Sequence, residues 1–126
     1  MSNLPSYGPY ASRGVVSGVR GRHEDYLRTV RGTIDTTSPS IVSGIGFSVS
    51  KIGVGYVSGT FSPAFASVPT VVFTAEAAGG GDLRIMELIT GTTASEFRVQ
   101  RKWVQPSTGS STLEDGVFTF IAVGPV

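Results

Sequence analysis

The chain has 126 residues, a formal net charge of +1 and no cysteine; 40% of its residues are hydrophobic and 15% are charged. A chain of this length can bury a core as a single domain, and without cysteines it has no disulfide, thiolate metal site or thiol nucleophile. The near-zero net charge gives no field strong enough to indicate nucleic acid or an acidic surface as a partner, and we expect nucleic acid to be an unlikely one. The sequence has neither a run of about 18 apolar residues nor a signal-peptide core, so we expect a soluble protein. The 17 glycines and 7 prolines predict short elements joined by turns, which favours an all-β fold.

Residues 1–25 are predicted to form an extended arm, because this segment carries Gly, Pro, Ser, Arg and two tyrosines without a helical or strand period. The basic side chains of this arm and of the strand after it suit docking onto an acidic protein surface at least as well as binding DNA. We expect the arm to anchor the chain to another protein, with residues 26–126 forming the domain. The candidate contacts are Tyr7, Tyr10, Arg13, Arg20 and Arg22.

The domain is predicted to begin with a strand and a hairpin. In YLRTVRGTI, residues 26–34, alternate side chains fall on two faces, as in a half-buried strand. GFSVSKIGVGYVSGTF follows the turn-rich DTTSPS and predicts a hairpin hinged near Gly53 and Gly55. Pro63 and Pro69 then bound a connection, because proline cannot donate a hydrogen bond to a central strand ladder.

The second half of the domain continues the strand pattern. PTVVFTAEA and LRIMELIT are predicted to pair as a hairpin through the turn Gly79–Asp82, and EFRVQRKWV and VFTFIAV give two further strands around the loop PSTGSST. No apolar pattern at helical spacing runs for about ten residues. We therefore expect an all-β fold, an antiparallel β-sandwich of about six to seven strands, with a barrel as the alternative.

The closing segment VFTFIAV, Val117–Val123, is mostly apolar on both of its faces. Such a strand needs cover on both sides, which a central position in a sandwich or a neighbouring subunit would supply.

No constellation in the sequence predicts catalysis or a metal site. The single histidine, His23, lies at the join between arm and domain, no serine sits in a G-x-S-x-G turn, and the tract His23–Asp25 has no second group of ligands. Glu114 and Asp115 precede Gly116 and are interpreted as a turn that leads into the last strand, although sequence alone leaves an acid/base pair open. We expect no enzyme activity, cofactor or metal.

The tract RVQRKWV allows two interpretations. Arg98, Arg101 and Lys102 lie beside Trp103 and would suit a ligand surface that binds sugars or nucleic acid. Strand alternation favours the simpler alternative, in which Trp103 is a core residue and Arg98 with Lys102 belongs to a solvated face.

Several motifs follow one another in a distinctive order between Ile41 and Val126. Gly46-Phe47 opens the segment, a Gly-rich hairpin and FSPAF follow, Pro69 precedes two valines, and DGVFTFIAVGP closes the chain. This order resembles a β-sandwich module at the C-termini of phage tail fibres and minor tail proteins, and it is similar to the related H-type lectin fold. The preceding LRTVRGTID is also similar to the lead-in of tail proteins from actinobacterial phages.

The resemblance implies a virion structural protein that forms a homotrimer, with other virion proteins and a host-surface glycan as partners. It also implies that the terminal strand packs towards symmetry mates, which assigns Phe118, Phe120 and Ile121 to an oligomer core. Tail fibres carry a long shaft before this module, whereas here only the arm of about 25 residues precedes it, so the arm would provide the attachment. No sugar-site cluster is evident for residue-by-residue transfer of lectin activity.

Two other functions fit the same expected fold. A capsid decoration or head-fibre protein would stabilise the shell from threefold positions, and a free-standing H-type-like lectin would bind sugar through a shallow aromatic platform. An enzyme has the least support, because the chain offers one histidine and no coupled acid/base motif.

Overall fold

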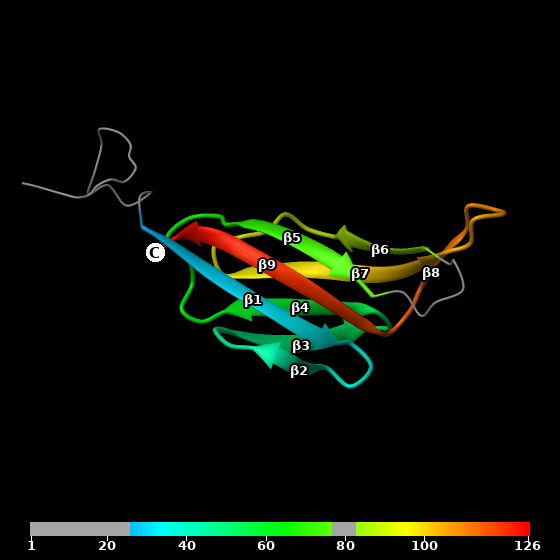
Figure 1. The fold of residues 1–126 in the computed structure, drawn as a ribbon, viewed down its shortest axis with the longest axis horizontal. Helices are drawn as coiled ribbons and strands as arrows, with labels where there is room; N and C mark the ends of the chain where they lie inside the picture. Colours follow the sequence, from blue (N-terminus) through cyan, green and yellow to red (C-terminus); the bar gives the residue numbers. More distant parts are fainter. Residues whose placement is uncertain (1–25, 77–82) are drawn as a thin grey trace, which may run out of the picture.

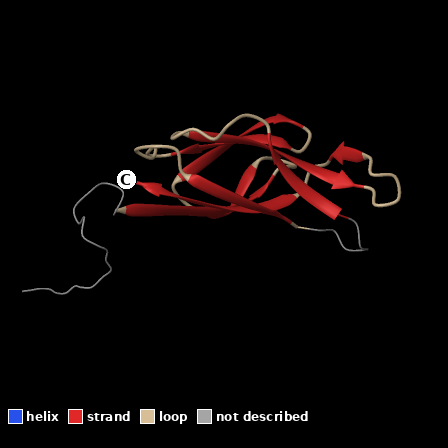
Figure 2. Ribbon diagram, turned by 90° about the horizontal axis from the view of Figure 1, so that it is seen from above, coloured by secondary structure: helices blue, strands red, loops and turns tan. Residues whose placement is uncertain are grey.

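The structure, a computed structural model, describes residues 26–76 and 83–126, and these form two antiparallel sheets packed face to face (Figures 1 and 2). The predicted all-β sandwich is therefore confirmed. The strands are β1 Leu27–Asp35, β2 Ser40–Gly44, β3 Phe47–Gly53, β4 Tyr56–Phe61, β5 Thr70–Ala75, β6 Leu83–Leu88, β7 Glu96–Val104, β8 Ser111–Leu113 and β9 Val117–Pro125. Within these two ranges no helix has the length and apolar character needed to cross a membrane.

One sheet, here called the β9 sheet, has the strand order β2-β1-β9-β5, and the other, the β7 sheet, has the order β3-β4-β7-β6 with β8 also paired to β7. The described residues thus contain nine strands rather than the six to seven expected. The two short strands β2 and β8 account for the difference, because they lie in or beside segments rich in Ser, Thr, Pro and Gly that indicate turns.

The predicted hairpin between β5 and β6 is wrong. β5 pairs with β9 and β6 pairs with β7, so the chain crosses from one sheet to the other between them. The turn predicted at Gly79–Asp82 lies outside the described residues. Gly-rich turn signals indicate that a chain reverses, but they do not specify which sheet receives the next strand. The hairpin hinged near Gly53 and Gly55 is confirmed, because β3 pairs with β4 across these residues.

All seven phenylalanines of the chain contribute to the core between the sheets. Phe120 from β9 lies at the centre, with its ring centroid 4.9 Å from those of Phe47 and Phe97. Gly59 makes room for this cluster, because a Cβ at that position would lie 2.3 Å from a ring atom of Phe97. Since each aromatic contact adds roughly 0.5–1.5 kcal/mol beyond the buried area, this cluster is a main source of stability.

The last strand occupies the centre of its sheet. β9 pairs along its whole length with β1, from Leu27 opposite Pro125 to Asp35 opposite Val117, and it pairs with β5 on its other edge. The start of β1 and the C-terminus therefore lie side by side (Figure 1). The apolar pattern of the closing segment is explained on one face by burial in the sandwich.

Candidate functional site

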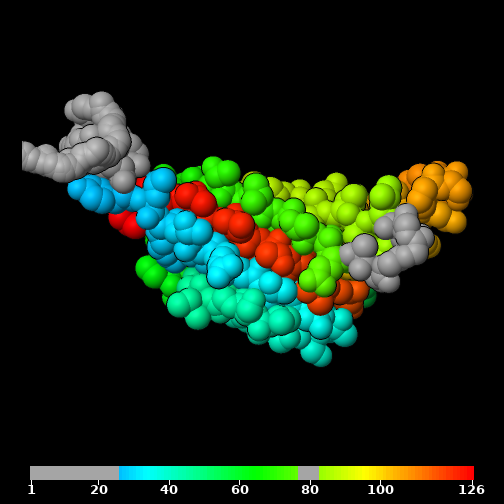
Figure 3. All heavy atoms as spheres, viewed as in Figure 1, coloured from blue at the N-terminus to red at the C-terminus, as the bar shows by residue number. Residues whose placement is uncertain are grey.

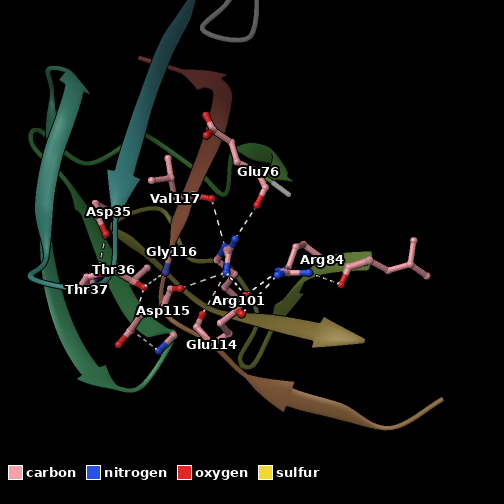
Figure 4. Close-up of polar contacts among 12 residues, drawn as sticks. Asp35, Thr36, Thr37, Glu76, Arg84, Arg101, Glu114, Asp115, Gly116 and Val117 are labelled. Carbon is pink, nitrogen blue, oxygen red and sulfur yellow. Dashed lines mark hydrogen bonds and ion pairs between the residues drawn. The ribbon is translucent and has the colours of Figure 1, made fainter. Parts of the chain in front are cut away.

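The most elaborate polar arrangement lies between the sheets at the end of the sandwich where β8 leads into β9 (Figure 4). Arg101 on β7 points inward and is only 4% exposed. Its Nη2 donates to the Glu76 carbonyl oxygen at 2.6 Å and its Nε to the Val117 carbonyl oxygen at 3.2 Å, while Nη1 donates to Glu114 Oε1 at 2.8 Å. One buried guanidinium thus connects the ends of β5 and β9 to the loop before β9.

Glu114 is shared by two arginines. Arg84 on β6 donates from Nε to Glu114 Oε1 at 2.6 Å, beside the contact from Arg101. Burial by itself would raise the pKa of Glu114, but the hydrogen bonds and charges of the two arginines outweigh it and hold the pKa below its ordinary value. The carboxylate is therefore an anchor for β6 and β7.

Asp115 performs the same task for the β3–β4 hairpin. Its Oδ1 accepts a hydrogen bond from the Gly55 backbone N–H at 2.7 Å and from Thr36 Oγ1 at 3.0 Å, and Lys51 Nζ lies 3.1 Å from the carboxylate. Burial opposes ionisation here too, but the Gly55 N–H, Lys51 and Thr36 together lower the pKa of Asp115. Gly55 has φ +63°, which suits glycine at this tight turn.

The chemistry available to these carboxyl groups is limited by their partners. A general acid needs a raised pKa and access to substrate, whereas Glu114 and Asp115 are held ionised by fixed cations and backbone donors. In the two ranges that the structure covers, no group of three His, Asp or Glu side chains gathers in a way that would hold a metal ion. The geometry is that of a structural clamp, and we call Arg101, Arg84, Glu114, Asp115 and Lys51 the polar clamp.

The predicted ligand surface is not a single surface. Arg101 is buried in the polar clamp, while Arg98 and Lys102 point from β7 to the outside. The two outward side chains are each paired, Arg98 with Glu96 at 3.3 Å and Lys102 with Glu87 at 2.6 Å. Strand alternation explains the separation, because residues one or three apart on a strand face opposite sides.

The predicted oligomer core also separates. Phe118 and Phe120 are fully buried by the chain's own second sheet, so they are not available to contact another copy. Only Ile121, which is 41% exposed, lies on the outer face. The sequence showed two apolar faces on this strand but gave no sign of which face the second sheet would cover.

The outer face of the β9 sheet, turned towards the viewer in Figure 3, contains a hollow of about 180 Å³. Cross-strand rows run over this face, with Ile121 opposite both Arg31 and Val72, and Thr119 opposite Thr33 and Thr74. The hollow, which we call the Arg31 hollow, is lined by Arg31, Gly32, Thr33, Ser43, Gly44, Thr119 and Ile121. Sequence reasoning missed it, because Ser43 and Gly44 belong to the unexpected strand β2.

A second exposed surface lies on the outside of the β7 sheet. Leu83, Ile85 and Leu113 are 53%, 42% and 37% exposed, and the ladder places Ile85 and Leu113 on either side of Lys102. We call these three residues the β6–β8 patch.

The arm residues Tyr7, Tyr10, Arg13, Arg20 and Arg22, and His23 beside them, lie outside the described residues. Their predicted anchoring role stays a prediction.

Three comparisons with known proteins gave no match: no family model fits the sequence, and no curated protein or solved structure is similar to it.

Proposed function

We propose that the chain is a bacteriophage virion structural protein of the tail or tail tip, which works by assembly and adhesion rather than by catalysis. The observation that carries the proposal is the division of its polar and apolar side chains. The charged side chains of the polar clamp bind one another and the backbone of the same chain, whereas exposed apolar side chains lie on the outer faces of both sheets. Apolar surface that remains exposed in this way is typical of proteins that function through contacts with other macromolecules.

The experiment is mass spectrometry of purified virions with quantification of this chain against the major capsid protein. A handful of copies per particle supports a tail location. Hundreds of copies would instead place the chain on the capsid as a decoration or head-fibre protein, and its absence from particles would refute a virion role and leave a free-standing lectin as the next hypothesis.

Attachment through the arm is the second part of the proposal. The described domain begins beside the C-terminus, at one end of the sandwich (Figure 1), and we propose the attachment at that end. Virions assembled with a variant lacking residues 1–25 should lose the protein, while the purified variant keeps the circular dichroism spectrum of a β-sheet protein. Normal incorporation of this variant would exclude the arm as the anchor.

The proposed homotrimer needs a surface, and two candidates are Ile121 on the β9 sheet and the β6–β8 patch on the β7 sheet. A charge introduced into a contact between copies is buried without a partner and weakens assembly. Light scattering therefore compares Ile85→Arg with Ile121→Arg, and the variant whose trimer dissociates identifies the surface that forms the contact. A wild-type chain that is monomeric at all concentrations would refute the trimer.

A further inference from the structure

We propose that the Arg31 hollow binds the carboxylate-bearing ring of an acidic sugar. This inference deepens the proposed adhesive function and rests on it for the biological source of the ligand. The binding itself is a property of the purified chain and is tested separately.

The hollow arises from the pairing of β1 with β2. Gly32 lies opposite Gly44, where a Cβ on either glycine would approach the ring of Phe47 on the core side, and the register of the two strands shifts just after Thr33. Thr33, Ser43 and Thr119 line the depression with hydroxyl groups, of which Thr33 Oγ1 and Thr119 Oγ1 share a hydrogen bond at 3.1 Å, and Ile121 adds an apolar wall. Its volume of about 180 Å³ is below the roughly 300–1,000 Å³ typical of sites for drug-sized ligands, which suits a single sugar ring.

Arg31 supplies the charge. Among the cations of residues 26–76 and 83–126, it alone has no hydrogen-bond or ionic partner within those residues. The other six are engaged: Arg28 with the Pro63 carbonyl, Lys51 with Asp115, Arg84 and Arg101 with Glu114, Arg98 with Glu96 and Lys102 with Glu87. A guanidinium group presents a planar fork that matches a carboxylate, so this side chain can make two parallel charge-assisted hydrogen bonds.

The surroundings of Arg31 favour a sugar acid over a phosphate. A phosphate ester carries a charge of about −1.5 to −2 at neutral pH and is best matched by several cations, whereas the hollow contains only one. Hydroxyl groups both donate and accept hydrogen bonds, so Ser43 and Thr119 can pair with ring hydroxyls, and the aliphatic Ile121 can contact the C–H face of the ring.

The same charge favours the β6–β8 patch over the surface around Ile121 as the contact between copies of the chain. Arg31 lies on the central pair of strands, opposite Ile121, and a subunit that covered it would have to bury an unpaired guanidinium or provide a carboxylate. A small anionic ligand satisfies the guanidinium without that penalty.

The test is a titration of the ¹⁵N-labelled full-length chain with D-glucuronate, D-glucose and inorganic phosphate, followed by amide chemical shifts. Glucuronate and glucose differ only at the C6 group, so glucose isolates the contribution of the carboxylate. We expect glucuronate to shift the amides around Arg31, Ser43 and Thr119 and to bind at least about 10-fold more tightly than glucose, as expected for hydrogen bonds to a charged group.

The variant Arg31→Gln should lower the affinity for glucuronate by about 10-fold or more, and Arg31→Lys should retain part of it. Arg98→Gln, an exposed arginine of the opposite sheet, is the matched control and should bind like the wild type. Because Arg31 is exposed and its side chain makes no hydrogen bond or ion pair within the described residues, the spectrum of the variant should otherwise be unchanged.

Three results of the wild-type titration would overturn the proposal: no shift near Arg31 up to tens of millimolar glucuronate, equal affinities for glucose and glucuronate, or phosphate binding as tight as glucuronate, which would indicate a simple anion site. Loss of binding in Arg98→Gln would move the site to the β7 sheet and refute it as well. None of these outcomes bears on whether virions contain the chain, so this inference and the virion role fail independently.

Discussion

Replacing Arg101 by methionine removes the centre of the polar clamp while keeping a side chain of similar length. The change deletes hydrogen bonds to the carbonyl oxygens of Glu76 and Val117 and to the Glu114 carboxylate, and it leaves these acceptors without that donor. Each hydrogen bond to a charged group contributes roughly 1.5–3 kcal/mol, and removing one member of a fully buried ion pair costs about 3–5 kcal/mol, a value that solvent lowers here because the Glu114 side chain is 38% exposed. Methionine recovers some packing and Glu114 keeps Arg84, so we expect a loss of about 3–4 kcal/mol from the free energy of unfolding.

Urea unfolding followed by fluorescence of Trp103, the only tryptophan, measures this loss directly. Arg98→Met is the matched control, because it lies on the same strand but points to solvent, and its unfolding midpoint should stay close to that of the wild type. The double variant Arg101→Met with Glu114→Gln should cost less than the sum of the two single changes, since the residues share one interaction. A loss below about 1 kcal/mol for Arg101→Met, or additive effects in the cycle, would show that the buried guanidinium does not hold the loop before β9.

Two further predictions concern the clamp carboxylates and the aromatic core. Because Glu114 and Asp115 have lowered pKa values in the folded chain, the unfolded chain takes up protons first as the pH falls, and the stabilising effect of the two carboxylates is complete above about pH 4–5 and is lost below it. The slope of the free energy of unfolding against pH in this acidic range should therefore be shallower in Asp115→Asn. An unchanged slope would exclude Asp115 as a contributor. Gly59→Ala should lower the free energy of unfolding by about 1–3 kcal/mol, because the new methyl group meets the ring of Phe97. Gly53→Ala is the control and should have little effect, since the nearest atom to its new methyl group is 4.0 Å away. Thermal melts compare the two variants, and equal melting temperatures would contradict the packing described for β4.

The parts of the fold that the sequence predicted are those governed by strand alternation and turn chemistry. The inward positions of Val30 and Ile34 on β1 and the hairpin at Gly55 are local consequences of period-two patterning and of a turn that favours positive φ. The pairing of β5 is different, because Gly79–Asp82 indicates a reversal whether the next strand joins the same sheet or the opposite one. Alternative sheets offer the strand similar apolar cover, and only the packed core decides between them.

The candidate sites show the same limit more strongly. Alternation correctly separates Arg98 from Trp103, but nothing local indicates that Arg101, at an apolar position of β7, would be neutralised by Glu114 from a distant loop. The Arg31 hollow depends on the pairing of β1 with β2, and a five-residue strand rich in Ser and Gly carries almost no signal in the sequence. Sites built from cross-strand neighbours therefore require the register, which the sequence does not specify by itself.

The position of the last strand connects the internal structure to the proposed external function. β9 is paired on both edges and buried on one face, so its backbone is satisfied within the chain and only its outer face, with Ile121, is available to a partner. If this strand lay at an edge of the sheet, its unpaired backbone groups could pair with the same strand of another copy, and its central position prevents this. The chain can therefore present β-branched side chains of this strand to the outside while its backbone stays unavailable for pairing with another chain. Contacts at this face are then made by side chains, as a selective binding surface requires.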